Sequence, residues 1–472
     1  MKRPTTLGEL KQSDYRPRSV KDEMRENLIA KLRHGEAIFP GIVGYDDTVI
    51  PQVVNAVLSR HDMLFFGLRG QAKSRMLRAL PALLDEFTPA VAGCDLFDDP
   101  IMPSFRHARA LIDEHGDNTS IRWVGREERY HEKLATPDVT VADLIGEIDL
   151  IKHAEGRYLN DEEIMHFGLI PRTHRGIFAI NELPDLAPRI QVAMFNVLEE
   201  RDVQIRGFPV RLPLDVCMVF SANPEDYTNR GRIVTPLKDR IGTVVRTHYP
   251  AKLEHGLAIT RENAWLERGN GAYEIDVPKY IFEIIEETIR LARQSPHINQ
   301  QSGVSVRTSI ACSETAVSSA ERRAILLSER KVVPRICDLA NIAASCRGKI
   351  ELLLAEDESA EDKLIQSLVG EAVKNIFENY MSIDELDGVV EQFRDGKNNL
   401  ETGDALASGQ LVAQLDAVGE LRNAAADLCR AAERNPDDDH DLASAAEFVL
   451  EALYVNNRLS KYAYRSKTFF KR

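Results

Sequence analysis

One short loop constrains the fold more than any other feature of this sequence. The apolar segment Met63–Phe66 (MLFF) leads into the loop Gly67–Ser74 (GLRGQAKS), and a helix-like segment, Arg75–Leu84, follows. A glycine-rich loop ending in Lys-Ser between a strand and a helix is typical of a loop that binds nucleotide phosphates. Such a loop requires an α/β fold in which a buried parallel strand delivers the chain to the ligand.

Each residue type in this loop suits phosphate chemistry. The Lys73 ammonium would neutralise the β- and γ-phosphate oxygens, and the Ser74 hydroxyl would hold Mg²⁺. Backbone N–H groups would cradle the phosphates; the expected nucleotide contacts are Gly67, Leu68, Arg69, Gly70, Gln71, Ala72, Lys73, Ser74 and Arg75. Ala72 stands where glycine usually precedes the lysine, so a methyl group narrows the backbone choices there. The competing interpretation is a chance Lys-Ser pair at a helix start.

A second strand, Gly176–Glu182 (GIFAINE), has the form of a Walker B strand. Such a strand normally ends in an Asp that supports Mg²⁺ and a Glu that orients the attacking water. Asn181 replaces the first carboxylate, which keeps an oxygen ligand but loses its charge, whereas Glu182 is intact. We therefore expect a metal site formed by Ser74, Asn181 and Glu182, with weakened metal binding.

Changes in composition and in hydrophobic pattern divide the chain into four regions. Residues 1–38 are polar, with a helix expected near Lys21–Arg33, and form an N-terminal helical arm. Residues 39–250 alternate short apolar runs, including Val216–Asn223, with amphipathic segments, as in an α/β domain. Strand signals stop after Tyr249, and residues 251–354 are expected to be a helical domain, with Pro278 at the start of a helix.

Charge separates the last region from the rest. The chain carries 60 Lys+Arg and 74 Asp+Glu, a net charge of −14. Residues 1–354 are nearly neutral, whereas residues 355–451 hold 24 acidic and 7 basic side chains. Residues 355–472 are therefore expected to be an acidic helical extension with a basic aromatic tail, and Asp441 is a candidate helix cap. The balance argues against a protein that coats nucleic acid or anionic lipid.

Other compositional signals favour a cytoplasmic protein. The basic N-terminus has no apolar run behind it, and no stretch approaches the roughly 20 apolar residues that a membrane helix needs. The six cysteines are scattered without a CxxC pair, which predicts reduced thiols and no zinc ribbon.

Six blocks in this order resemble the ATPase subunit of magnesium chelatase and the related MoxR-type AAA+ ATPases. They cover about residues 36–350 and read FPGIVGYD (39–46), FFGLRGQAKS (65–74), GEIDLIKHAEGRY (146–158), HRGIFAINEL (174–183), SANPED (221–226) and TPLKDRIGT (235–243). The resemblance implies an AAA+ P-loop NTPase core with a parallel sheet, followed by a helical lid domain. The acidic helical C-terminal region is additional to that pattern.

The resemblance also implies residue roles. Asn223 would be the sensor-1 residue, Arg240 the arginine finger reaching into a neighbouring subunit, and Arg307 the sensor-2 residue facing the γ-phosphate. The catalytic set would be Glu182, Arg240, Asn223 and Lys73, and the adenine pocket would be lined by Ile42, Val43 and Tyr45. A surface arginine is the alternative for Arg240, and a solvated arginine for Arg307. Residues 140–170 and Val203–Pro213 would form hairpins that face a ring pore or a partner.

The function implied is a ring-forming ATPase, with a hexamer favoured, that uses ATP and Mg²⁺ to remodel a partner of von Willebrand A type. A nucleotide-gated scaffold with little hydrolysis is the alternative that Ala72 and Asn181 motivate. A transcriptional activator of the AAA+ enhancer-binding type is a third, but the GAFTGA loop of that group is absent from the sequence. Neither membrane nor nucleic acid is expected as a partner, and the acidic extension is expected to select the partner protein.

Overall fold

The computed structural model divides the chain into two compact units, Met1–His248 and Tyr249–Arg472. It describes residues 3–148, 165–204, 211–224, 231–268, 273–353, 358–394, 400–464 and 467–471. The units are described separately below. No helix among these residues combines the length and the apolar character needed to cross a membrane.

A parallel sheet forms the centre of the first unit, in the order β11-β1-β10-β7-β4. Its strands are β1 (Met63–Phe66), β4 (Tyr130–Leu134), β7 (Gly176–Asn181), β10 (Val216–Ala222) and β11 (Thr243–Arg246). The strands expected around residues 63, 176 and 216 are confirmed. Because side chains alternate along a strand, Met63 and Phe65 enter one core and Leu64 the other. This two-sided burial explains why these strands appear as continuous apolar runs.

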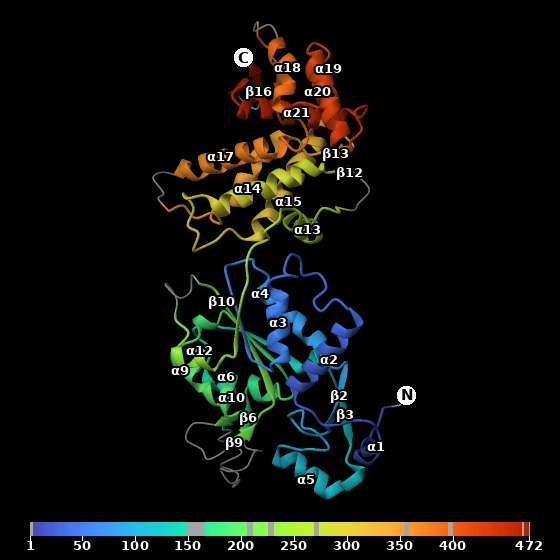
Figure 1. Ribbon diagram of the computed structural model, residues 1–472, viewed down its shortest axis with the longest axis vertical. Helices are drawn as coiled ribbons and strands as arrows, with labels where there is room; N and C mark the ends of the chain where they lie inside the picture. Colours follow the sequence, from blue (N-terminus) through green and yellow to red (C-terminus); the bar gives the residue numbers. More distant parts are fainter. Residues whose placement is uncertain are drawn as a thin grey trace. The chain divides into compact units, whose positions relative to one another are not determined.

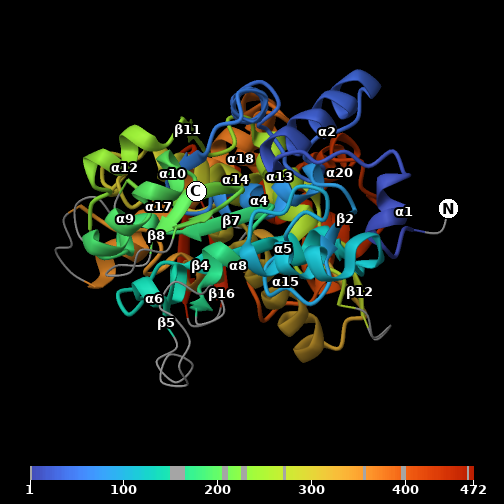
Figure 2. The same ribbon diagram turned by 90° about the horizontal axis from the view of Figure 1, so that it is seen from below.

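Helices cover both faces of this sheet (Figure 1). One core joins it to α2 (Val20–His34), α3 (Val49–Leu58) and α4 (Lys73–Ala79). The opposite core receives apolar side chains from α9 (Pro188–Ala193), α10 (Phe195–Glu199) and α12 (Thr235–Arg240), which gather at one side of the unit in both views (Figure 2). The helix expected over residues 75–84 begins at Lys73 and gives way to a 3₁₀ turn at Leu80–Leu83.

The first unit also contains four short helices outside the two cores' main helices and three antiparallel strand pairs among the described residues. The helices are α1 (Leu7–Lys11), α5 (Arg106–His115), α6 (Val141–Leu144) and α8 (Leu169–Arg172). Antiparallel pairs join β2 (Phe87–Val91) to β3 (Ile121–Gly125), β5 (Gly146–Ile148) to β6 (Met165–Phe167), and β8 (Asp202–Gln204) to β9 (Arg211–Pro213). The last two pairs lie where hairpins were expected; residues 149–164 and 205–210, which include most of one block of the resemblance, lie outside the described residues.

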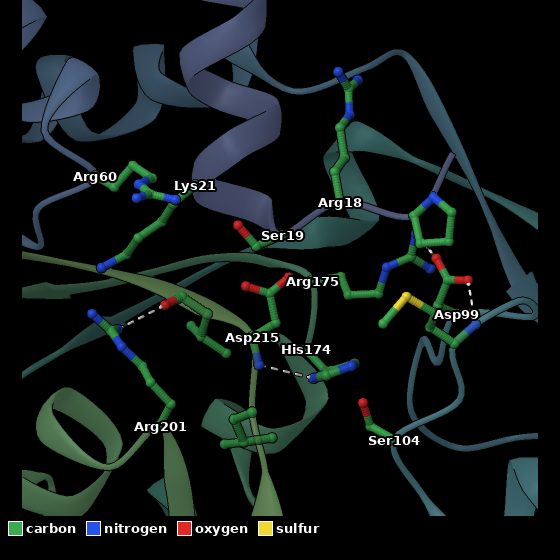
Figure 3. Close-up of a pocket in the computed structure, with 14 residues that line it drawn as sticks. Arg18, Ser19, Lys21, Arg60, Asp99, Ser104, His174, Arg175, Arg201 and Asp215 are labelled. Carbon is green, nitrogen blue, oxygen red and sulfur yellow. Dashed lines mark hydrogen bonds and ion pairs between the residues drawn. The ribbon is translucent and has the colours of Figure 1, made fainter. Parts of the chain in front are cut away.

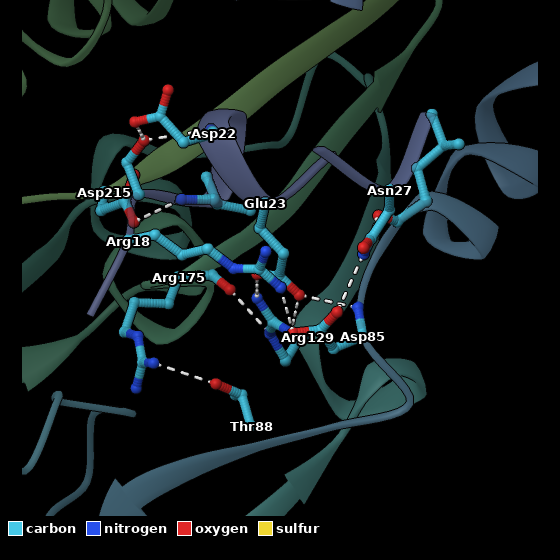
Figure 4. Close-up of polar contacts among 12 residues, drawn as sticks. Arg18, Asp22, Glu23, Asn27, Asp85, Thr88, Arg129, Arg175 and Asp215 are labelled. Atoms are coloured by element: carbon cyan, nitrogen blue, oxygen red, sulfur yellow. Dashed lines mark hydrogen bonds and ion pairs between the residues drawn. The ribbon is translucent and has the colours of Figure 1, made fainter. Parts of the chain in front are cut away.

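The N-terminal arm is part of the first unit's core. The Glu23 carboxylate on α2 accepts a hydrogen bond from Arg129 Nη1 at 2.8 Å and pairs with Nη2 at 2.5 Å, and both side chains are buried (Figure 4). Asp215, before β10, accepts from the Val20 backbone N–H at 2.7 Å. The segment around α2 therefore packs as part of the first unit, and this unit begins before residue 39.

The second unit is largely helical. Its α-helices are α13 (Leu253–Asn263), α14 (Lys279–Gln294), α15 (Val306–Leu327), α16 (Ala343–Cys346), α17 (Glu358–Phe377), α18 (Asp387–Gln392), α19 (Ser408–Leu415), α20 (Gly419–Ala431) and α21 (Asp439–Val455). The expectation that strands stop after Tyr249 is wrong. The structure has a parallel pair, β12 (Glu274–Ile275) with β13 (Lys331–Val332), and an antiparallel sheet of β14 (Leu400–Thr402), β16 (Lys467–Lys471) and β15 (Ser460–Tyr464).

The larger core of this unit spans both halves of its sequence, and Ala320, Ala324 and Val332 form a small separate cluster. The larger core joins side chains of α14 to those of α17 and α21, for example Tyr280 stacked on Phe448 at 4.8 Å between ring centroids. Composition separated residues 251–354 from 355–472, but the two ranges share their buried apolar side chains. The cap of α21 is also different from the expected one: Asp438 accepts from the His440 N–H at 2.8 Å, and Asp441 is buried against Arg434.

Candidate nucleotide-binding site

The phosphate-loop sequence lies at the carboxyl end of β1. Gly67 is packed so closely that a Cβ there would meet Thr247 Oγ1 at 2.0 Å and Gln71 Oε1 at 2.2 Å. Gly70 has φ +72°, a conformation that glycine adopts without strain. The two glycines are therefore required for different reasons. Gly67 leaves no room for a side chain, and Gly70 has a backbone conformation that other residues adopt only with strain.

Ala72 is in the left-handed region, with φ 53° and ψ 14°, directly before α4. This conformation places the alanine Cβ near the following carbonyl oxygen and costs about 1–2 kcal/mol relative to the right-handed form. The departure from glycine thus lies at a position whose backbone conformation glycine would adopt freely. The loop keeps its shape with a strained residue next to Lys73.

Three predicted side chains form a hydrogen-bonded chain. Lys73, which is 7% exposed, donates to the Gly67 and Leu68 carbonyl oxygens at 2.6 and 2.8 Å and to Asn223 Oδ1. The Asn223 amide donates in turn to Glu182 Oε2 at 2.6 Å. The structure therefore brings together the loop lysine, the polar residue that follows β10 and the carboxylate that follows β7.

Oxygen atoms gather around Asn181. Its Oδ1 accepts from Ser221 Oγ at 3.0 Å and from Ser74 Oγ at 3.4 Å. The described residues contain no cluster of three or more His, Cys, Asp or Glu side chains suited to a metal. Mg²⁺ commonly takes one or two protein oxygens and completes its shell with waters and substrate phosphates. The Ser74 and Asn181 oxygens fit that mode of binding.

Tyr45, one of the residues expected to line an adenine pocket, is buried. It is 4% exposed, and its hydroxyl donates to the Gln71 carbonyl at 2.8 Å and to the His248 carbonyl at 2.9 Å. It thereby connects the phosphate loop to the chain after β11. Ile42 is partly buried against the core that the sheet shares with α2, α3 and α4, and Val43 is half-buried.

Arg240 at the end of α12 is held by its own unit. Its Nε donates to Glu199 Oε2 at 2.6 Å, its Nη1 donates to the Pro236 carbonyl at 2.9 Å, and its guanidinium lies 4.8 Å from the Phe195 ring centroid. Arg307 lies at the exposed start of α15 in the second unit, where its N–H donates to Ser305 Oγ at 3.1 Å.

Sequence reasoning missed Ser221 and Glu132. Ser221 accepts from the Glu182 N–H at 3.1 Å while donating to Asn181, so it links the carboxyl ends of β7 and β10. Glu132 on β4 accepts from the Asn181 amide and from Arg78 Nε at 2.8 Å. Hydrogen bonds from Arg78 hold the pKa of Glu132 below its ordinary value. The signal for Ser221 was its place before Asn223; no local pattern marked Glu132.

A cavity of about 590 Å³ lies at the opposite end of the sheet, beside His174, Arg175 and Asp215, which precede β7 and β10 (Figure 3). Three of its cations are paired: Lys21 with Asp62 at 2.7 Å, Arg201 with Asp62 at 3.0 Å and Arg175 with Asp99 at 3.1 Å. The cavity is separate from the phosphate loop, which lies at the carboxyl end of β1.

Comparisons with known proteins agree with the resemblance. No family model matches the chain. Residues of this chain are 27% identical over 247 residues to the magnesium-chelatase 38 kDa subunit of Acidiphilium rubrum, covering 50% of this chain and 65% of that protein. The subunit of the same name from Cereibacter sphaeroides is 29% identical over 232 residues, covering 48% and 64%. The chain thus spans slightly less than two thirds of these relatives.

Among solved structures, a complex between subunits BchI and BchD of magnesium chelatase aligns at 23% identity, covering 69% of this chain and 98% of that chain, with a TM-score of 0.36. The sequence relatives, together with a parallel sheet whose β1 leads into the phosphate loop, support the family resemblance. The chain is therefore similar in sequence to the magnesium-chelatase 38 kDa subunit, and its first unit has an α/β fold built on a parallel sheet.

Proposed function

We propose that the chain binds ATP with Mg²⁺ at residues 67–75 and hydrolyses it. The observation that carries this proposal is the hydrogen-bonded chain from Lys73 through Asn223 to Glu182. In this chain Asn223 links a lysine suited to neutralise phosphate charge to a carboxylate that would orient the attacking water. Ser74 and Asn181 would supply oxygen ligands to the Mg²⁺ that accompanies the nucleotide.

The direct test is steady-state hydrolysis and nucleotide binding by the full chain. Lys73→Ala should abolish both, because the phosphates lose their cation. Glu182→Gln should retain ATP binding and lose hydrolysis, because the amide cannot accept the proton from water. Equal phosphate release by the wild type and both variants would exclude ATP hydrolysis at this site.

A second function, a nucleotide-gated scaffold, is favoured by two observations. Ala72 strains the loop, and the metal site has an amide where a carboxylate would bind Mg²⁺ more strongly. Binding of ATP by the wild type and its loss in Lys73→Ala, with no phosphate release above that of Lys73→Ala, would support the scaffold instead of the enzyme.

We further propose that the chain acts in a ring, with a hexamer favoured, in which Arg240 serves a neighbour's site. Its pairing with Glu199 would then be exchanged for contact with the neighbour's nucleotide. Mixing Arg240→Ala with Glu182→Gln subunits tests this, because a heterologous interface would combine one intact arginine with one intact carboxylate and restore hydrolysis.

The proposed client is a partner protein, of von Willebrand A type by family resemblance, selected by residues 355–472. Exposed carboxylates there, such as Glu378, Asp384 and Glu385, offer a surface that neutralising substitutions would alter without touching the core. Recovery of partners with the Glu182→Gln chain in ATP, before and after neutralisation, would identify the client. Unchanged recovery would exclude a role for this acidic surface in selecting the partner.

A further inference from the structure

Glu132 lies on the strand next to the proposed metal site and contacts it through Asn181. In the register of β4 and β7, Glu132 is opposite Ala179 and Leu134 is opposite Asn181, so Glu132 and Asn181 are diagonal neighbours. Glu132 Oε1 accepts from Asn181 Nδ2. The carboxylate is further held by Arg78, whose Nε and Nη2 donate at 2.8 and 2.9 Å, and by the Tyr130 hydroxyl at 3.1 Å.

This contact fixes the orientation of an amide whose two ends differ chemically. An ionised carboxylate only accepts hydrogen bonds, so the Asn181 atom that faces Glu132 must be the nitrogen. The amide oxygen is then turned to the opposite side, toward Ser221 Oγ at 3.0 Å and Ser74 Oγ at 3.4 Å. Serine hydroxyls would tolerate either end, because a hydroxyl both donates and accepts. Glu132 is therefore the partner that decides which end faces Ser74.

The charge of Glu132 has a second effect. The Arg78 guanidinium pairs with this carboxylate, with 2.8 Å between Arg78 Nε and Glu132 Oε2. The Glu132 side chain is 18% exposed, so solvent screens it only in part. A negative charge behind the amide nitrogen polarises the amide and makes its oxygen a better cation ligand.

We propose that Glu132 is a positioning residue that presents the Asn181 oxygen to the Mg²⁺ of bound nucleotide. The residue acts through Asn181, and this inference rests on the proposed nucleotide function. It also accounts for the amide at a position where a carboxylate is usual: a carboxylate at 181 would face Glu132 with like charge.

The test measures binding, independently of turnover. A fluorescent ATP analogue is titrated into the full chain with Mg²⁺ and with EDTA, and the ratio of the two dissociation constants gives the benefit of the metal. Glu132→Ala should reduce that benefit about tenfold and leave the EDTA affinity near that of the wild type. Glu132→Gln, which keeps the shape of the side chain and loses its charge, should give an intermediate loss.

Glu128→Ala is the matched control. It also removes a glutamate that pairs with an arginine, Arg122, but this glutamate lies in the 3₁₀ turn before β4, where it accepts from the Gly125 N–H at 3.3 Å. Its metal benefit should equal that of the wild type. A Glu132→Ala chain that matches Glu128→Ala would overturn the positioning role.

Repeating the Glu132→Ala measurement in a chain that carries Asn181→Asp distinguishes a positioning role of Glu132 from a purely structural one. In an Asn181→Asp chain the Glu132 carboxylate opposes a like charge, so Glu132→Ala should now raise the metal benefit. A residue that merely supports the fold would lower it in both backgrounds, and that result would refute the inference. If wild type and Lys73→Ala bind the analogue equally, the proposed function itself fails; if only the Glu132 result fails, nucleotide binding stands.

Discussion

At the scale of single residues, Ala72 joins the loop to α4 in a backbone conformation that glycine would adopt without strain. Ala72→Gly should raise the free energy of unfolding of the first unit by up to about 1 kcal/mol, because the left-handed strain outweighs glycine's extra freedom in the unfolded chain. Ala79→Gly is the matched control, because Ala79 has φ −86°, which alanine adopts without strain. This substitution should lower the free energy of unfolding by roughly 0.5–1 kcal/mol.

Urea unfolding reports this difference when it is followed by Trp123 fluorescence. The chain has two tryptophans, and Trp265 belongs to the second unit, so a Trp265→Phe background isolates the signal of the first. Destabilisation by Ala72→Gly would show that the Ala72 methyl makes contacts worth more than the strain.

His174 gives the first unit a specific sensitivity to acid. Burial, with the nearby Arg175 charge, lowers the pKa of His174 to about 3. Below the ordinary histidine pKa of about 6.5 the unfolded chain binds a proton that the folded chain does not, so the free energy of unfolding falls as pH drops from about 6.5 toward 3. The slope approaches 1.4 kcal/mol per pH unit for one proton.

His174→Gln should remove this slope between pH 6 and 4.5 in the same urea experiment. Buried Asp98 and Asp215 have raised pKa values and therefore bind protons more readily when folded, which opposes the effect of His174. Both carboxyls remain in the variant, so the difference between the two pH profiles reports His174. Parallel profiles would contradict the prediction.

At the scale of elements, α2 is anchored to the sheet by the buried Glu23–Arg129 pair. Glu23→Gln should lower the free energy of unfolding by about 3–5 kcal/mol, because Arg129 would keep a buried charge without its counter-charge. Glu26→Gln on the same helix is the control: its partner Arg18 also contacts Asp85, and its carboxylate is 56% exposed, so the change should be small. Equal shifts in the urea midpoints would refute the anchoring role.

The strands of the central sheet were predictable because short apolar runs bounded by turns have few other solutions. β4 was not, because its sequence, YHEKL, offers no apolar run, and Glu132 meets Asn181 only through strand pairing across the fold. The loop and β7 residues were predictable from local motifs. The sheet of β14, β16 and β15 was missed because β14 is only three residues long and pairs with β16, more than sixty residues later in the sequence.

At the scale of the whole molecule, the acidic composition of residues 355–451 predicts a domain boundary that the buried side chains of the second unit do not follow. Charge describes the solvent-facing side chains, whereas units are defined by shared buried surface. In the second unit, α14 buries Tyr280 against Phe448 of α21, and the Tyr280 hydroxyl donates to Ser444 Oγ at 2.6 Å. The acidic helices therefore complete the core of the helices before them.

This shared core predicts which pieces of the chain fold. Residues 249–472 expressed alone should unfold in one cooperative thermal transition, followed by circular dichroism. Residues 249–354 should not, because the face of α14 that carries Tyr280, Ile284 and Ile285 would lose the apolar partners that bury it. The shorter piece should instead bind a hydrophobic dye and melt without a sharp transition. A cooperative melt of residues 249–354 at the midpoint of the longer piece would show that the acidic helices are a separate domain, in which case deleting them would become a clean test of partner selection.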